Sequence, residues 1–226
     1  MVYNNIKKGK FIDRPNRFIA HIEIDGVIET CHVKNTGRCK ELLVPNATVF
    51  VQEFDSDKRK TKYDLISVFK SNKLINMDSQ VPNKVIAEYL PQLFNDIKYV
   101  KPESKYKNSR FDFYVETSTD KIFIEVKGVT LEKNGVVMFP DAPTERGVKH
   151  INELIECIED GYLAYIIFVI QMDNVEYFKP NDDTHKEFGN ALRNAQDKGV
   201  NILAIDCNVT ENSIAAKNPV QVKIAK

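Results

Sequence analysis

The sequence predicts a mixed α/β protein in two parts, a small β-barrel followed by a layered α/β region. In residues 1–82, apolar and polar residues alternate with the period of a strand in several short runs, and helical spacing is scarce. In residues 83–226, apolar residues recur at helical spacing between strand-like runs. We therefore expect two domains, residues 1–82 and residues 83–226.

The first part contains strand patterns in residues 18–24, 27–33, 47–53 and 63–69. Asp25-Gly26 separates the first two, and Asp-Gly between alternating runs is a strong hairpin signal. Many short strands in a segment of this size are typical of a small barrel or sandwich, and an OB-like barrel is the form we predict.

The second part is expected to open with a helix that Pro82-Asn83 caps and that runs to about Leu93. Strand patterns at 98–103, 110–115 and 123–127 follow, and Asn134-Gly135 predicts a further hairpin. A helix with a clear apolar stripe then ends near Gly161. Residues 164–170 form an apolar run typical of a strand covered on both faces, and a helix at 186–198 and a strand at 202–209 complete the pattern.

Composition sets the class of protein. No run of 18 apolar residues exists and the first ten residues lack an apolar stretch, so we expect neither a membrane span nor a secretory signal. The protein is predicted to be soluble and cytoplasmic. The four cysteines form no Cys-x-x-Cys pair, which argues against a zinc site and a disulfide framework, so buried free thiols are expected.

The net charge is zero, but its distribution is uneven. Residues 1–82 hold 14 Lys and Arg against 10 Asp and Glu, which leaves 18 against 22 in residues 83–226. A mildly basic barrel beside a mildly acidic domain is compatible with a nucleic-acid-binding platform next to a metal-using site. This excess alone is weak evidence for nucleic acid.

The strands around Asp112 and Glu125 carry the main functional signal. Strict alternation places Phe111, Phe113 and Val115 on one face and Asp112 on the other. If residues 117–120 close a symmetric hairpin, Asp112 lies opposite Glu125. Like charges at such a position are destabilising unless something neutralises them, and a divalent cation would do so.

Lys127 follows two residues after Glu125 on the same face, where an ammonium can contact a phosphate or a metal-activated water. The alternative is that all three are ordinary residues of a solvated strand face. A second basic group, Arg146, Lys149 and His150, lies within one helical turn and suggests a nearby anion. A solvated helix face, with a half-buried histidine, is the alternative there.

Several longer motifs resemble the sugar fermentation stimulation protein family, SfsA. They are Asn35-Thr36-Gly37-Arg38, residues 60–65, residues 109–113, Glu125-Val126-Lys127, and above all residues 139–147 with Lys149-His150. The resemblance covers nearly the whole chain. It implies an N-terminal OB-like domain and a C-terminal domain similar to PD-(D/E)XK nucleases.

In that superfamily an Asp and a Glu hold Mg²⁺ and a Lys completes the site, roles that fall on Asp112, Glu125 and Lys127. An acidic residue of the first helix often joins them, and Glu88 is the candidate. Gln171 resembles an accessory residue of some related nucleases, although polar residues commonly end strands.

The resulting hypothesis is a nuclease dependent on Mg²⁺ (or Mn²⁺) that hydrolyses phosphodiester bonds of DNA and/or RNA. Asp112, Glu125 and the carbonyl of Val126 are expected to hold the metal. The residues expected to contact nucleic acid are Arg14, Arg17, Arg38, Lys60 and Lys62 in the barrel, with Arg146, Lys149 and His150.

Two other hypotheses stay open. One is a nucleic-acid-binding regulator of sugar metabolism genes without turnover, and the other is a metal-stabilised structural module. The oligomeric state is open too, with a homodimer as one option.

Overall fold

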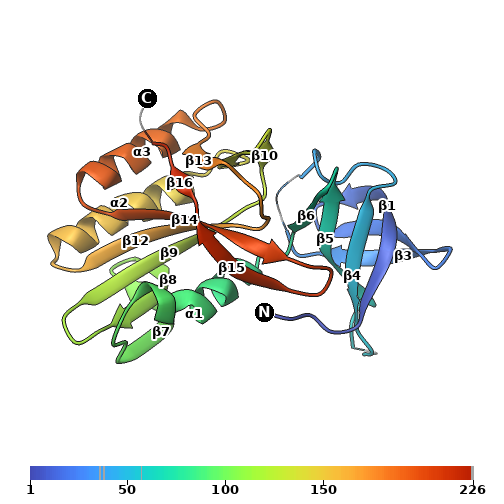
Figure 1. Ribbon diagram of the computed structural model, residues 1–226, viewed down its shortest axis with the longest axis horizontal. Helices are drawn as coiled ribbons and strands as arrows, with labels where there is room; N and C mark the ends of the chain where they lie inside the picture. Colours follow the sequence, from blue (N-terminus) through green and yellow to red (C-terminus); the bar gives the residue numbers. More distant parts are fainter. Residues whose placement is uncertain (36, 38, 57, 225–226) are drawn as a thin grey trace.

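The computed structural model describes the whole chain except residues 36, 38, 57, 225 and 226. Two domains lie side by side, a barrel and a sheet covered by helices (Figure 1). The chain is therefore mixed α/β in the predicted order, the barrel first.

Five strands form the barrel: β1 (Ile6–Asn16), β2 (Ile19–Ile24), β3 (Val27–Val33), β4 (Thr48–Glu53) and β5 (Tyr63–Lys70). They pair in the order β3-β2-β1-β4-β5, and β3 pairs in parallel with β5, which closes the sheet on itself. Closure removes the exposed strand edges, as in the five-stranded OB barrel. The predicted small barrel is confirmed.

Strand β1 was not predicted, because its sequence is rich in lysine and contains Gly9 instead of a clear apolar alternation. The structure explains the glycine. A Cβ at position 9 would lie 2.6 Å from the Ile22 side chain and 2.7 Å from the Glu23 carbonyl oxygen. Only a residue without a side chain lets β1 approach β2 this closely.

The second domain is built on a six-stranded mixed sheet in the order β15-β14-β12-β9-β8-β7. Its strands are β7 (Tyr99–Tyr106), β8 (Ser109–Glu116), β9 (Lys121–Val129), β12 (Leu163–Ile170), β14 (Asn201–Val209) and β15 (Ile214–Pro219). Strands β9, β12 and β14 run parallel, and β12 between them is buried on both faces, as its apolar sequence predicts.

Helices cover both faces of this sheet (Figure 1). Helix α1 (Val81–Leu93) packs on one face, and α2 (Glu145–Glu159) and α3 (Lys186–Asp197) pack on the other. Helix α2 begins where the Thr144 hydroxyl accepts a hydrogen bond from Gly147 N. A small second sheet consists of β10 (Glu132–Lys133), β11 (Val136–Phe139), β13 (Tyr177–Pro180) and β16 (Gln221–Val222).

The two domains are joined by buried contacts as well as by the chain. Strand β6 (Lys73–Asn76) leads from the barrel into α1. The Gln171 side chain, at the end of β12, donates hydrogen bonds to the carbonyl oxygens of Asn76 and Asp78. Tyr3 packs in the core beneath α1, and Val2 pairs with Ser213. The barrel is thereby held in a defined position against the sheet domain.

All four cysteines are buried free thiols, as expected. Among the described residues, no helix combines the length and the apolar character that crossing a membrane requires.

Candidate active site

The register of the β8–β9 hairpin is the one predicted from its turn. Phe113 pairs with Ile124, and Tyr114 pairs with Phe123. The pairing ends there, one residue short of Asp112 and Glu125. Beyond that point the backbone N–H of Val126 in β9 donates to a side chain of β8 and not to its backbone. The acceptor is Oδ2 of Asp112, at 2.7 Å.

The strict alternation predicted for β8 is wrong at this point. Phe113 belongs to the core beneath α1, whereas Phe111 packs on the opposite side, with its ring 6.1 Å from that of His150 in α2. The pairing of β7 with β8 is irregular at the same place. Glu103 of β7, which falls opposite Asp112, has a left-handed φ of 51°, and the two residues are not paired. An irregular residue changes the face on which its neighbours point.

Glu125 is the most buried member of the site, with 3% of its surface exposed. Its Oε1 accepts hydrogen bonds from the Lys127 ammonium and, at 2.6 Å, from His150 Nδ1. Burial by itself raises the pKa of Glu125, but the hydrogen bond from His150 and the Lys127 charge outweigh it and hold that pKa below its usual value. Glu125 is therefore a carboxylate at neutral pH.

The second oxygen of Glu125 is different. Oε2 is buried and has no hydrogen-bond partner among the described residues. A buried carboxylate oxygen without a donor is costly, and such atoms in native proteins are commonly explained by an ion or a functional role. Oε2 of Glu125 is therefore available to accept a hydrogen bond or to bind a cation.

His150 is buried and forms a hydrogen bond with Glu125, so it does not lie on the protein surface. The imidazole is buried, and its Nε2 accepts a hydrogen bond from Arg146 Nε at 3.3 Å, which leaves the proton on Nδ1 for Glu125. The expectation that His150 contacts nucleic acid directly is wrong, because the ring lies between helix α2 and strand β9. Arg146 keeps an exposed side chain at the rim and orients the histidine.

Asp112 is held by two hydrogen bonds. Its Oδ1 accepts from Asn83 Nδ2 at 2.7 Å, and its Oδ2 accepts from Val126 N. Burial and the nearby Glu125 charge raise the pKa of Asp112. The two carboxylates thus repel each other, and a positive charge between them would relieve that repulsion.

Asn83 is a site residue that the sequence did not reveal. It was expected to cap α1, but the helix begins earlier, with Gln80 at the N-cap, and Asn83 lies inside the first turn. An isolated asparagine near a helix start reads as a cap, so no signal in the sequence separates the two roles.

Glu88 does not join the group. Its Oε2 pairs with the N-terminal ammonium of Met1 at 2.7 Å, and its side chain is largely exposed. Met1 in turn donates to the carbonyl of Ile214 in β15, at the far edge of the sheet from β8. Helix α1 crosses the sheet, so its first turn reaches Asp112 while Glu88 lies toward β15. Asn83 is the residue of α1 that contacts Asp112.

The remaining predicted cations have separate positions. Arg14 donates to the carbonyls of Arg17, Asn35 and Gly37, so it holds a loop, and Arg17 is exposed. Lys62 pairs with Glu53 at 2.7 Å and Lys149 with Glu153 at 3.7 Å, and both lysines stay more than half exposed. Lys60 is exposed between β4 and β5, and Arg38 lies outside the described residues.

The donor set suits a hard divalent cation bound with help from a ligand. No three His, Cys, Asp or Glu side chains among the described residues are grouped to enclose a metal. Asp112, Glu125 and the Val126 carbonyl offer oxygen donors that would fill part of the shell of such a cation. Mg²⁺ commonly binds through one or two carboxylates and completes its shell with water and phosphate oxygens.

Comparison with known proteins agrees with the resemblance seen in the sequence. A family model described as the sugar fermentation stimulation protein RE domain matches residues 80–213, and one described as the SfsA N-terminal OB domain matches residues 12–77. The chain belongs to the SfsA family.

SfsA relatives match it from end to end. The sugar fermentation stimulation protein homolog of Clostridium beijerinckii is 66% identical over 224 residues, which are 98% of this chain and 99% of that protein. The homolog of Ruminiclostridium cellulolyticum is 64% identical over 226 residues, 99% of this chain and 100% of the relative. The structure of Pyrococcus furiosus SfsA in complex with Ca²⁺ superposes with a TM-score of 0.87 at 29% identity, covering 99% and 98% of the two chains.

Proposed function

We propose that this chain is a nuclease that hydrolyses phosphodiester bonds with the help of Mg²⁺ or Mn²⁺. The observation that carries the proposal is the pair of carboxylates, Asp112 and Glu125. The buried Oε2 of Glu125 has no donor among the described residues, and Lys127 donates to the other oxygen, Oε1. A fold of the RE type supports this use of the site.

The metal requirement has support from chemistry and from a relative. Asp112 and Glu125 offer only oxygen ligands, which hard cations prefer. The SfsA of Pyrococcus furiosus was obtained in complex with Ca²⁺, a hard cation with the same ligand preference. When bound, such a cation would polarise the phosphate and lower the pKa of a water.

Each protein group would then have one role. Asp112, fixed by Asn83 and the Val126 amide, and Glu125, fixed by His150, would hold the cation in one place. Lys127 would stabilise the negative charge that develops on the phosphate or orient the attacking water. Arg146, at the exposed rim, would contact the phosphate backbone.

The barrel would bind the nucleic-acid substrate. OB barrels commonly bind oligonucleotides across their strands and loops, and Arg17, Lys60 and Lys62 are exposed cations on this one. DNA and RNA are both candidate substrates.

The test is cleavage of labelled single- and double-stranded DNA and RNA in Mg²⁺, Mn²⁺ or EDTA, with Asp112→Ala and Lys127→Ala beside the parent. We expect products that depend on the metal and disappear in both variants, while salt-sensitive binding persists. Binding without cleavage by the parent under every condition would overturn the proposal and favour a regulator without turnover. Loss of folding in the variants would favour a structural role for the site.

A further inference from the structure

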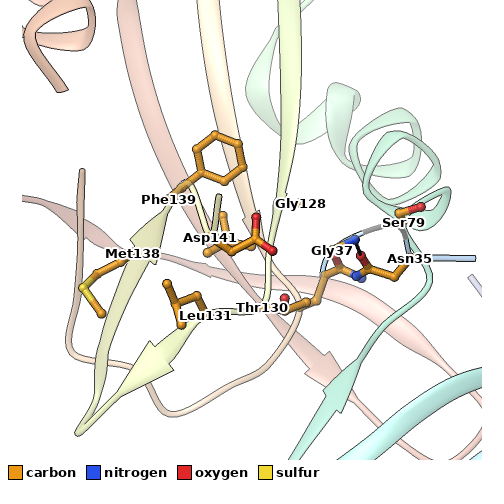
Figure 2. A pocket seen from close by; sticks show the side chains of 11 residues that line it. Asn35, Gly37, Ser79, Gly128, Thr130, Leu131, Met138, Phe139 and Asp141 are labelled. Atoms are coloured by element: carbon orange, nitrogen blue, oxygen red, sulfur yellow. Dashed lines mark hydrogen bonds between the residues drawn. The ribbon is translucent and has the colours of Figure 1, made fainter. Parts of the chain in front are cut away.

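A pocket of about 180 Å³ lies between the two domains, at the end of strand β9 (Figure 2). Its wall includes Gly128, the residue after Lys127 in β9. A Cβ at Gly128 would lie 2.8 Å from Pro82, whose neighbour Asn83 binds Asp112. The pocket and the carboxylate site are therefore connected through strand β9, in which Glu125 precedes the lining residue Gly128 by three positions.

The lining of this pocket does not suit a phosphate. It includes the Asp141 carboxylate and contains no Lys or Arg among the residues that the structure describes. It combines apolar side chains, Leu131, Met138 and Phe139, with polar ones that include the buried Gln171. Most of the lining surface is polar, and a polar lining without a cation suits an uncharged group that offers hydrogen-bond donors.

Two acceptors face this space. Gln171 is buried, and its Nε2 donates to the carbonyls of Asn76 and Asp78 and to Asn76 Oδ1, which fixes the amide. Its Oε1 lies over Gly128, 2.6 Å from where a Cβ would be, and receives no hydrogen bond from any described residue. Across the pocket, Asp141 lies against Gly37 (Figure 2). Acceptors in a pocket without a cation match the N–H edge of a nucleobase.

The size of the pocket limits what can enter. Sites for whole small molecules measure roughly 300–1,000 Å³, so this one suits a single ring system and excludes a base pair. On the other side of Gly37 a wider groove of about 590 Å³ carries Arg17 and Lys40. Cations there can follow the phosphates of a strand whose base occupies the pocket.

We infer that this interdomain pocket holds one unpaired nucleobase of the strand being cut, so that the substrate is single-stranded at the cleavage point. This inference rests on the proposed nuclease function for its biological meaning. The binding of the base does not depend on cleavage, and it can be measured on its own.

Thr130 offers a matched pair of variants. It lines the pocket just after β9, half-buried, and its hydroxyl makes no hydrogen bond to another described residue. Thr130→Tyr fills the pocket, and Thr130→Val keeps its volume. Met138→Trp, from β11, fills the pocket independently in case the tyrosine variant does not fold.

The experiment measures binding of two labelled single strands by fluorescence anisotropy in EDTA, one intact and one with every base replaced by an abasic residue. In the parent and in Thr130→Val, we expect the intact strand to bind more tightly. In Thr130→Tyr the ratio of the two affinities should fall about tenfold, the scale of one stacked base, while the abasic strand binds as before. A duplex of the same sequence should bind more weakly than the intact single strand.

An unchanged ratio in folded Thr130→Tyr and Met138→Trp would overturn the inference, as would a duplex that binds as tightly as the single strand. Because EDTA removes the metal, these outcomes are independent of turnover. A base-dependent ratio in a protein that never cleaves would reject the nuclease and keep the pocket. Cleavage by the parent, with no change in the ratio of the two affinities in the pocket variants, would keep the nuclease and reject the pocket.

Discussion

The carboxylate of Asp112 accepts a hydrogen bond from the backbone N–H of Val126 at the point where β8 stops pairing with β9. A side chain thus continues the hydrogen bonding that a strand would otherwise provide. The contact holds Asp112 beside Glu125, and the repulsion between them contributes to the raised pKa of Asp112.

Replacing Asp112 with Asn should stabilise the metal-free protein at neutral pH, because the ionised carboxylate is buried beside Glu125. Substitutions that remove an unfavourable charge interaction commonly add about 0.5–2 kcal/mol. The raised pKa means that ionisation costs stability above the folded-state pKa of Asp112. The gain should therefore shrink as the pH falls through that pKa and vanish below the ordinary value of 3.8.

Thermal unfolding of the parent and of Asp112→Asn in EDTA, from neutral to acidic pH, checks this. Ca²⁺ should reverse the order of stability, because only the parent keeps both carboxylates. A variant that is less stable than the parent in EDTA at neutral pH would contradict the assigned repulsion.

Removing the His150 imidazole should weaken metal binding without removing a ligand. His150 holds Oε1 of Glu125 from the side, and loss of such a partner typically costs 10–100-fold in affinity or activity. His150→Asn keeps a donor near the position of Nδ1 and should recover part of the loss. Ca²⁺ titration by calorimetry measures the effect, and equal affinities in the parent and His150→Ala would rule out this positioning role.

Substitution of two residues of α1, Asn83 and Glu88, should affect the cleavage rate differently. Asn83→Ala removes the donor to Asp112 and should reduce cleavage roughly tenfold, as expected for a group that orients a ligand. Glu88→Gln should leave cleavage unchanged, because Glu88 pairs with Met1, and its exposed ion pair should contribute less than about 1 kcal/mol. Initial cleavage rates of the two variants decide this, and a loss confined to Glu88→Gln would contradict the placement of the helix.

Lys34 should contribute to the free energy of unfolding and not to the binding of nucleic acid. Its ammonium lies 3.1 Å from Asp64 in the barrel and 3.1 Å from Asp78 in the segment before α1, and both carboxylates are buried. Lys34→Met would leave Asp78 without its cation and should cost about 3 kcal/mol, with little dependence on salt.

Lys62→Met is the control for that variant, because its pair with Glu53 is exposed and should contribute less than about 1 kcal/mol. Urea unfolding at low and high salt measures both variants. Equal losses in the two would show that the interdomain contact is no stronger than a surface ion pair.

Local patterns were sufficient for the barrel strands other than β1, for the helices and for the β8–β9 register, since each depends on residues close in the sequence. The turn at 117–120 alone set which residues of β8 and β9 face each other. The same reasoning failed at Phe111, where β7 and β8 are irregularly paired, because strict alternation assumes a regular strand.

The sequence by itself determined the two-part α/β architecture and brought Asp112, Glu125 and Lys127 together, because hairpin pairing and strand periodicity are local properties. Only the tertiary structure decided that Asn83 and not Glu88 supports Asp112, that His150 is buried against Glu125, and that a pocket forms between the domains. These depend on how helices cross the sheet and how the barrel packs against it, and such packing involves residues far apart in the chain.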